Sequence, residues 1–515
     1  MFRRFLSVSG FTLLSRITGF IRDILQAAIL GAGPLSDAFF VAFLFPSYFR
    51  SLFGEGTINP AFLPRYAALQ ARGEKAAAAG FADAVFSWQM AAQMVILVAA
   101  LWAMPLVVRV MAPGFDGNPG EIALTAHLSR ITFPYLILTV VVVQLSAMLN
   151  ALEKFAAAAA WSILLNVAMI AALFASAWFP NAAEAAAWGV LAGGFAQLFF
   201  ILIAARRAGL SLRMTLPRWT PEIAEFFKAF AAVTFGAASV LIAPFIDMLL
   251  ASMLASGSLT ALYYANRIDQ LPLGVLGIAL GTVLLPEMSA KLALGDARGS
   301  DAAQNKAATL SLLTVLPFAM AFVAIPDTIM RAIFAHGHFD VQAAGISAVA
   351  LAAYGAGLPA FAMVRILAST FYARHDTMTP ARITAFSVAA NIALKVALVW
   401  GLGFGIGGIA FGTSFGAWVN VGALVWLGRK RDLLHIDAQF RRAVPAILIA
   451  AAATAAGALA GGQVGLHLLH PGAYRDLGAL ALAVLLGGGG YFGCVVLFRG
   501  RLPLGRLSRR RVVPA

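Results

Sequence analysis

The chain has 515 residues, of which 61% are hydrophobic and 11% are charged, and its mean hydropathy is +0.87. No soluble domain of this length has such a composition, which therefore predicts a polytopic membrane protein. The formal net charge of +15 does not indicate nucleic-acid binding, because basic loops between apolar spans are what the positive-inside rule produces. The single cysteine, Cys494, excludes an intramolecular disulfide.

Apolar runs predict an all-α fold with fourteen transmembrane helices, at about 20 residues for each span. The predicted spans cover residues 8–31, 35–62, 82–112, 122–152, 156–179, 185–206, 222–254, 258–290, 305–334, 340–371, 378–402, 405–428, 442–465 and 477–498. The basic start MFRRFLSVSGFTLL leads into the first span without an obvious processing site. We interpret it as a retained span rather than a cleaved signal peptide.

The connections between these spans fall into two groups by charge. With Arg3 and Arg4 in the cytoplasm, the connections on their side are PRYAALQARGEK, EKF, ARRAGLSLRMTLPRW, AKLALGDARGSDAAQNK, ARHDTMTPAR, GRKRDLLHIDAQFRR and RGRLPLGRLSRRRVVPA. The opposite connections are GAG, APGFDGNPGE, FPNAA, ASGS, AHGHFD, GLGFGIG and HPGAYRD, which contain one arginine, Arg475. This distribution predicts that both termini are cytoplasmic.

An internal repeat divides the chain. The segment FIRDILQAAILGAGPLSDAFF resembles PFIDMLLASMLASGSLTALYY, and Asp23 matches Asp247 at a spacing of 224 residues. Asn166 recurs as Asn391 at a spacing of 225. Six helices therefore repeat and two follow. Because each repeat has an even number of spans, we expect parallel repeats about an axis along the membrane normal, with a cavity between the lobes.

The repeat predicts three parts of the chain. They are an N-terminal lobe at 1–216, a C-terminal lobe at 217–433, and two last helices with a basic cytoplasmic tail at 434–515. A polar, proline-containing linker at about 211–220 joins the lobes.

Charged residues interrupt the first two predicted spans, where each would be costly if it faced lipid at the bilayer centre. They are Arg16, Arg22, Asp23, Asp37, Arg50 and Glu55. They must therefore face protein or water, and arginines around a cavity would attract an anionic head group with several charges. The alternative for Arg22 is a buried strut to Asp23 or Asp37.

Two further charges lie in the predicted C-terminal lobe. Arg267, in YYANRIDQLP, would let a cation from each lobe clamp a diphosphate, and the alternative is an arginine that faces the cytosol or snorkels. Asp247, in VLIAPFIDMLLASM, is a candidate to bind a coupling cation, H⁺ or Na⁺. The alternative for Asp247 is a pair with a backbone group or an arginine.

Several motifs resemble those of a known family. SRITGFIRD, GAGPLSDAFFVAF, FGEG and ASGSLTALYYANRIDQLPLGVLGIALGTVLLP are similar to the MurJ (MviN) family of lipid II flippases, in the multidrug/oligosaccharidyl-lipid/polysaccharide exporter superfamily. The likeness covers essentially the whole chain, and it implies that the substrate-binding charges are Arg16, Arg22, Asp23, Asp37, Arg50, Glu55 and Arg267. Two positions depart from the family pattern: Ser51 replaces a second arginine, and Gln270 stands where an acid can occur, with Asp269 one position earlier.

The resemblance implies a flippase that carries lipid II, the undecaprenyl-diphosphate-linked disaccharide-peptide, to the outer leaflet of the bacterial inner (cytoplasmic) membrane by alternating access. Such a protein is not an enzyme, and it needs no cofactor apart from a coupling ion (H⁺ or Na⁺) or the membrane potential. We expect lipid II, membrane lipids and cell-wall synthesis proteins as partners, and no nucleic acid. Two alternatives are a flippase for another polyprenyl-linked oligosaccharide and a cation-coupled multidrug exporter, which the arginines disfavour.

The remaining motifs predict structure rather than chemistry. The last two predicted helices are apolar and small, so they either hold the polyprenyl tail in a groove or serve packing alone. His336 and His338 lack a third ligand, so we expect loop residues and no metal site. GLGFGIGG has no βαβ context and no Walker A motif occurs, which argues against nucleotide binding. The pairs Gly189/Gly193 and Gly408/Gly412 predict close helix packing.

Overall fold

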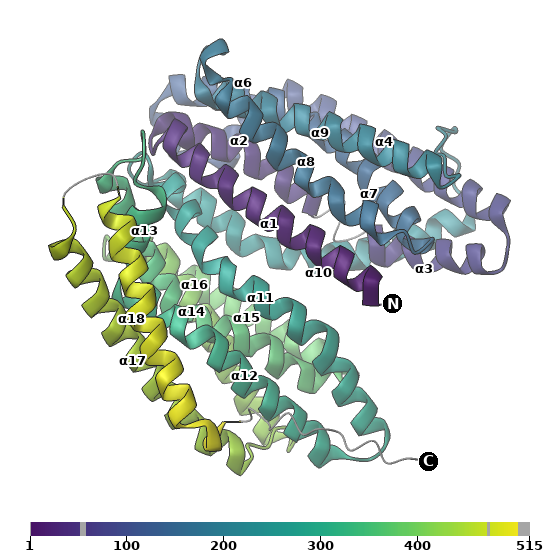
Figure 1. The fold of residues 1–515 in the computed structure, drawn as a ribbon. Helices are drawn as coiled ribbons and strands as arrows, with labels where there is room; N and C mark the ends of the chain where they lie inside the picture. The colour runs from purple at the N-terminus through teal and green to yellow at the C-terminus, as the bar shows by residue number, and fades with distance from the viewer. Residues whose placement is uncertain (1, 52–57, 471–473, 503–515) are drawn as a thin grey trace. The chain divides into compact units, whose positions relative to one another are not determined.

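The computed structural model describes residues 2–51, 58–470 and 474–502, and for residues 2–9, 235–240 and 275–283 it describes the backbone alone. The described elements are helices joined by short connections, and no strand occurs among these residues (Figure 1). The all-α prediction is therefore confirmed.

The helices pack into two units, Met1–Thr260 with His336–Asp340, and Ala261–Ala335 with Val341–Ala515. The first unit holds α1 (Phe2–Leu30), α2 (Pro34–Arg50), α3 (Ile58–Ala71), α4 (Lys75–Trp102), α5 (Met104–Met111), α6 (Pro119–Thr132), α7 (Tyr135–Ala151), α8 (Phe155–Phe174), α9 (Ala182–Arg207) and α10 (Pro221–Ser252). The second holds α12 (Ala297–Ala324), α13 (Pro326–Phe334), α14 (Val341–Tyr372), α15 (Met378–Val396), α16 (Gly405–Lys430), α17 (Ala438–Leu468) and α18 (Arg475–Leu497). The long helix α11 (Ser258–Ala293) begins in the first unit and continues into the second.

These units are defined by packing, whereas the predicted lobes at 1–216 and 217–433 are defined by the sequence repeat. The lobe boundaries therefore stay a prediction. The number of spans also stays a prediction, because ten helical segments among the described residues are long and apolar enough to cross a membrane.

Proline divides three of the predicted spans into two helices each. The breaks precede or coincide with Pro105, Pro134 and Pro326, at the starts of α5, α7 and α13. Proline has no N–H to donate and its ring clashes with the preceding turn, so a helix that meets it ends or bends there.

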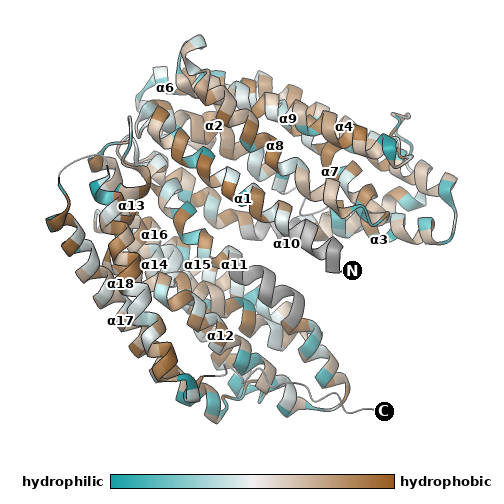
Figure 2. Cartoon of the chain, in the orientation of Figure 1, coloured by the Kyte–Doolittle hydropathy of each residue, from teal (hydrophilic) through white to brown (hydrophobic). Residues whose placement is uncertain are grey.

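Hydrophobic residues predominate along the helices, and hydrophilic residues concentrate in connections such as the one between α3 and α4 (Figure 2). Large apolar side chains are also exposed, including Trp102 at 87% and Trp178 at 88%. Water would disfavour such side chains, whereas a bilayer solvates them. The chain is accordingly a multi-pass membrane protein.

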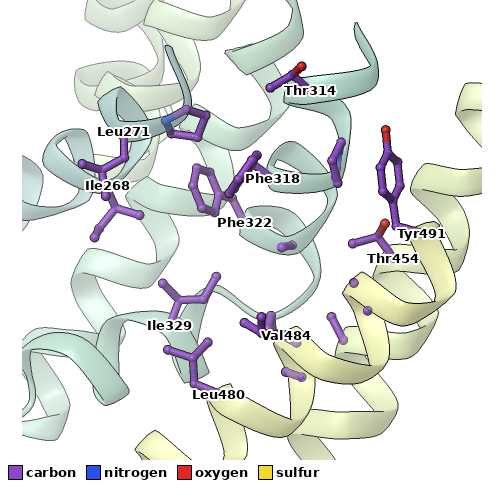
Figure 3. A pocket seen from close by; sticks show the side chains of 18 of the residues that line it. Ile268, Leu271, Thr314, Phe318, Phe322, Ile329, Thr454, Leu480, Val484 and Tyr491 are labelled. Carbon is purple, nitrogen blue, oxygen red and sulfur yellow. The ribbon is translucent and has the colours of Figure 1, made fainter. Parts of the chain in front are cut away.

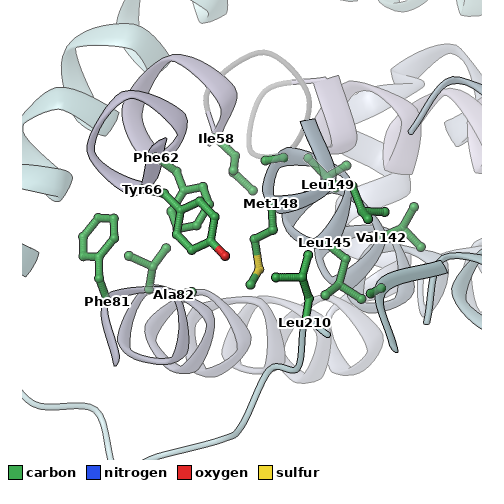
Figure 4. Packing of buried hydrophobic residues seen from close by; sticks show 14 of the residues in the cluster. Ile58, Phe62, Tyr66, Phe81, Ala82, Val142, Leu145, Met148, Leu149 and Leu210 are labelled. Atoms are coloured by element: carbon green, nitrogen blue, oxygen red, sulfur yellow. The ribbon is translucent and has the colours of Figure 1, made fainter. Parts of the chain in front are cut away.

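The first unit has an aromatic and aliphatic core between α3, α4 and α7 (Figure 4). Phe62 stacks on Tyr66 and on Phe81, with ring centroids 5.1 and 5.5 Å apart. Met148 and Leu149 of α7 complete this cluster. This cluster contains no residue of α1 or α2, so the buried polar residues of those two helices lie outside it.

The predicted linker is anchored along α4. The backbone N–H of Arg213 donates to Oδ1 of Asp83 at 2.8 Å, and that of Thr215 donates to Oγ of Ser87 at 2.9 Å. Both acceptors lie on α4, so the non-helical residues after α9 have a defined path to the start of α10.

The two predicted glycine pairs lie at helix contacts, which confirms their packing role. Gly189 and Gly193 of α9 face α8, and a Cβ atom on Gly193 would lie 2.9 Å from Cα of Leu165. Gly408 and Gly412 of α16 pack against the end of α15 and the π-helical turn that follows it. Small residues allow membrane helices to approach this closely.

The last two helices make the same kind of contact over a longer stretch. Gly457, Gly461 and Gly465 of α17 face α18, and a Cβ atom on Gly461 would lie 2.5 Å from the carbonyl oxygen of Leu482. Gly489 of α18, in contrast, has open space where its Cβ would be.

We predict that Gly461→Ala lowers the melting temperature of the purified protein and that Gly489→Ala does not. Alanine favours a helix over glycine by about 0.5–1 kcal/mol, so only the steric clash with the α18 backbone can make the first substitution unfavourable. Thermal unfolding in detergent, followed by tryptophan fluorescence, measures both variants. Equal melting temperatures would contradict this packing.

Candidate functional site

Arg22 is held by a buried network on α1. Its Nε and Nη2 atoms donate to Oδ1 of Asp23 at 3.1 and 2.5 Å, and its Nη1 atom donates to Oδ1 of Asn166 at 3.1 Å. Arg22 and Asp23 are 5% and 0% exposed. Of the two struts that the sequence left open for Arg22, the structure contains the one to Asp23. The pair compensates its own charge, as a buried ion pair must.

Asn166 links this network to a second helix. From α8, its Nδ2 atom donates to the carbonyl oxygen of Ser15 at 3.1 Å and to Oγ1 of Thr18 at 3.3 Å, both on α1. The sequence analysis did not assign Asn166 to the site. Its recurrence as Asn391 was the available signal.

Asp37 is the second buried charge of the first unit. It is 3% exposed, and its carboxylate accepts hydrogen bonds from the N–H of Gly257 at 2.6 Å, the N–H of Thr260 at 2.9 Å and the hydroxyl of Thr260 at 2.5 Å. These donors lie immediately before and within the first turn of α11, where the unpaired N–H groups and the helix dipole favour an anion. Neither Gly257 nor Thr260 was assigned to the site from the sequence.

The other predicted site residues occupy different positions. Arg16 is exposed on α1, Arg50 is half-buried at the last residue of α2, and Asp247 is half-buried on α10. Arg267 is half-buried on α11 within the second unit. Glu55 lies outside the described residues. The structure thus brings Arg22 and Asp23 together and holds Asp37 separately, and the substrate-binding role of the whole set stays a prediction.

The departure from the family pattern near Arg267 lies next to a buried acid. Asp269 is 3% exposed on α11, and its Oδ1 atom is buried with no hydrogen-bond partner among the described residues. Gln270, at the departing position itself, is exposed and donates to Oδ1 of Asn266 at 2.5 Å.

The second unit contains an apolar groove of about 580 Å³. Helices α11, α12 and α13 form one wall, with Leu271, Phe318 and Phe322, and helices α17 and α18 form the other, with Leu480 and Val484 (Figure 3). Nearly all of the lining is hydrocarbon, so the groove suits an apolar chain rather than a polar solute. The last two helices thus form one wall of this groove in addition to their contact with each other, and tail binding stays a prediction.

We predict that Asp37→Ala lowers thermal stability more than Thr260→Val. The first substitution leaves two buried backbone N–H groups without their acceptor, at a cost of about 1–3 kcal/mol for each unsatisfied group, whereas the second removes one hydroxyl donor. Melting temperatures of the two purified variants test the difference. If Asp37→Ala had the same melting temperature as the unsubstituted protein, the hydrogen bonds at the start of α11 would not contribute to stability.

Comparison with known sequences identifies the relatives of this chain. The family described as Lipid II flippase MurJ matches residues 26–472. A protein of Rhizobium tropici named probable lipid II flippase MurJ is 36% identical, with 100% of this chain and 98% of the relative covered. A protein of Burkholderia cenocepacia named lipid II flippase MurJ is 33% identical, with 74% and 75% covered.

Solved structures agree on the fold. A structure described as lipid II flippase MurJ in an inward closed conformation superimposes with a TM-score of 0.77 at 23% identity, covering 96% of this chain and 99% of that one. An inward-facing multidrug transporter of the MATE family gives a TM-score of 0.65 at 17% identity, covering 81% and 94%. The extent and identity of the sequence matches place this chain in the lipid II flippase MurJ family.

Proposed function

We propose that this protein flips lipid II from the inner to the outer leaflet of the bacterial inner membrane. The observation that carries the proposal is the family match over residues 26–472, together with relatives of nearly full coverage that bear this name. The substrate has an anionic diphosphate with a sugar-peptide head and a long apolar tail. No covalent bond has to change for it to cross the membrane, so we propose a transporter without catalytic residues.

The arginines of the predicted site suit the diphosphate. A guanidinium presents several N–H donors in a planar fork that matches phosphate oxygens. We propose that Arg16, Arg50 and Arg267 bind the head group, with Glu55 as a further predicted member, and that Arg22, which donates to Asp23 and Asn166, supports the site. An intramembrane arginine that is exposed, such as Arg16, is otherwise costly, and substrate binding gives a reason for its presence.

The apolar groove suits the tail. Its walls offer hydrocarbon contacts along α12, α13, α17 and α18, and burial of each CH₂ group contributes about 0.8 kcal/mol. The tail can then stay in an apolar environment while the head group crosses.

We further propose that transport uses alternating access of two repeat lobes, with both termini in the cytoplasm. The basic connections all fall on one side in the predicted topology, which supports this orientation. Asp247 is the candidate for a coupling ion, H⁺ or Na⁺, because an ionisable residue within a membrane span is functional by default. Cell-wall synthesis proteins are the expected partners.

The test of the substrate is depletion of the protein in its host, with outward lipid II measured by a membrane-impermeant probe. We predict that depletion removes outward lipid II and that Arg16→Ala and Arg267→Ala restore about tenfold less of it than the unsubstituted protein, since a hydrogen bond to a charged group contributes about 1.5–3 kcal/mol. Arg298→Ala, at an exposed arginine of the first turn of α12, is the control and should restore transport fully.

Normal outward lipid II after depletion would overturn the proposal. A simultaneous loss of another polyprenyl-linked oligosaccharide from the outer leaflet would then favour the second kind of flippase. Immunoblots of the membrane fraction establish that the arginine variants are present in equal amounts.

The groove is tested with two neighbouring glycines of α18. Gly488 lines the groove, Gly489 does not, and both have open space at the Cβ position. We predict that Gly488→Phe fills part of the groove and lowers the rate of lipid II flipping several-fold, whereas Gly489→Phe changes it little. Equal rates for the two variants in reconstituted vesicles would exclude the groove as the tail site.

A further inference from the structure

Two short connections, one in each repeat, share a glycine followed closely by a phenylalanine. One is APGFD, within residues 112–116, and the other is AHGHFD, within residues 335–340. Gly114 and Gly337 are 223 residues apart, and Phe115 and Phe339 are 224 apart. The two phenylalanines are 4% and 1% exposed, so each connection is anchored by a buried ring.

The first connection packs against the end of α10. The N–H of Gly114 donates to Oγ of Ser252 at 3.3 Å, and that hydroxyl donates in turn to the carbonyl oxygen of Leu249 at 2.7 Å. A Cβ atom on Gly114 would lie 1.9 Å from the carbonyl oxygen of Ser252, so only glycine allows this approach. The connection after α5 thereby covers the last turn of α10.

The second connection packs against the end of α1 in the same way. The N–H of His338 donates to the carbonyl oxygen of Ala28 at 2.8 Å, and a Cβ atom on Gly337 would lie 2.3 Å from that oxygen. Gly337 also has φ +62°, a conformation that suits glycine. Ala28 and Ser252 are 224 residues apart, which is the spacing of the repeat.

A third contact joins equivalent residues directly. The hydroxyl of Thr260 donates to Oγ of Ser36 at 3.0 Å, and these two residues are also 224 apart. In each repeat, therefore, the glycine-containing connection packs on the first helix of the other repeat. In addition, the equivalent residues Ser36 and Thr260 contact each other directly. Contacts that exchange in this way are self-complementary, as across a two-fold axis.

We propose that the Gly114 and Gly337 connections are a paired latch that holds this end of the first unit closed. The inference rests on the proposed alternating access, because a carrier must open the end at which it releases its cargo. All the segments involved adjoin connections that the charge pattern predicts on the side opposite the termini. The latch holds through backbone contacts and few hydrogen bonds, so it stabilises the closed state without preventing its opening.

The latch sets the population of the closed state. Enlarging either glycine pushes a connection off the opposing backbone and favours the open state. Since the clash is with main-chain atoms, no side-chain rotation relieves it. Ser252 acts differently from the two glycines, because it contributes a hydrogen bond through its hydroxyl group rather than a close backbone approach.

The test measures the rate at which a thiol reagent reaches a residue beneath the latch. Ala27, next to Ala28 on α1, is 0% exposed, so Ala27→Cys in a Cys494→Ala background reports opening of the purified protein in lipid nanodiscs. We predict that Gly114→Ala and Gly337→Ala each raise the labelling rate at least about tenfold and that Ser252→Ala raises it about threefold, as expected for loss of one net hydrogen bond. Gly117→Ala, in the same connection as Gly114 but with open space at its Cβ, should leave the rate unchanged.

Labelling rates that match the Gly117→Ala control in all three latch variants would overturn the proposal. If the glycine variants fail to fold, Ser252→Ala decides, because it removes one hydroxyl group and introduces no steric clash. The measurement uses no lipid II, so a negative result refutes the latch and leaves the proposed substrate untouched. Labelling rates as predicted, together with normal outward lipid II after depletion, would refute the substrate alone.

Discussion

A carboxylate enclosed by apolar helices must find hydrogen-bond donors, and Asp37 finds them at the first turn of α11. This requirement fixes α2 against the loop that precedes α11. It also brings Ser36 beside Thr260, its equivalent in the second repeat. The glycine connections then close over the ends of the neighbouring helices. The packing at this end of the first unit therefore follows from one buried charge and its donors.

The same constraint acts on Arg22, with a different outcome. Here the counter-charge is the adjacent residue Asp23, and the side-chain oxygen of Asn166, on another helix, accepts a hydrogen bond from Nη1. A pair of this kind is electrically neutral and rigid, so it suits the support of a site better than the capture of a diphosphate. The exposed Arg16 suits the proposed phosphate contact better, because its guanidinium can exchange water for phosphate oxygens.

Sequence patterns predicted the membrane class, the helical class and the glycine contacts because hydropathy and small-residue spacing are properties of single helices. The sequence named Asp23 and Asp37 as partners for Arg22 but could not choose between them, since an adjacent residue and a distant one compete for the same guanidinium. The latch was hidden for a different reason. His338 adds one residue between Gly337 and Phe339, which shifts the glycines to a spacing of 223 while the phenylalanines stay at 224. A fixed repeat register therefore misses the match.

The two repeats have also diverged where charge is concerned. The position equivalent to Arg22 is Ile246, so the acid that follows, Asp247, lacks the adjacent arginine that compensates Asp23. The charge of Asp23 is therefore compensated within its own helix, whereas the charge of Asp247 has to be compensated by a group elsewhere. The two repeats thus share a backbone pattern but not a charge pattern, so the coupling-ion role proposed for Asp247 does not extend to its equivalent, Asp23.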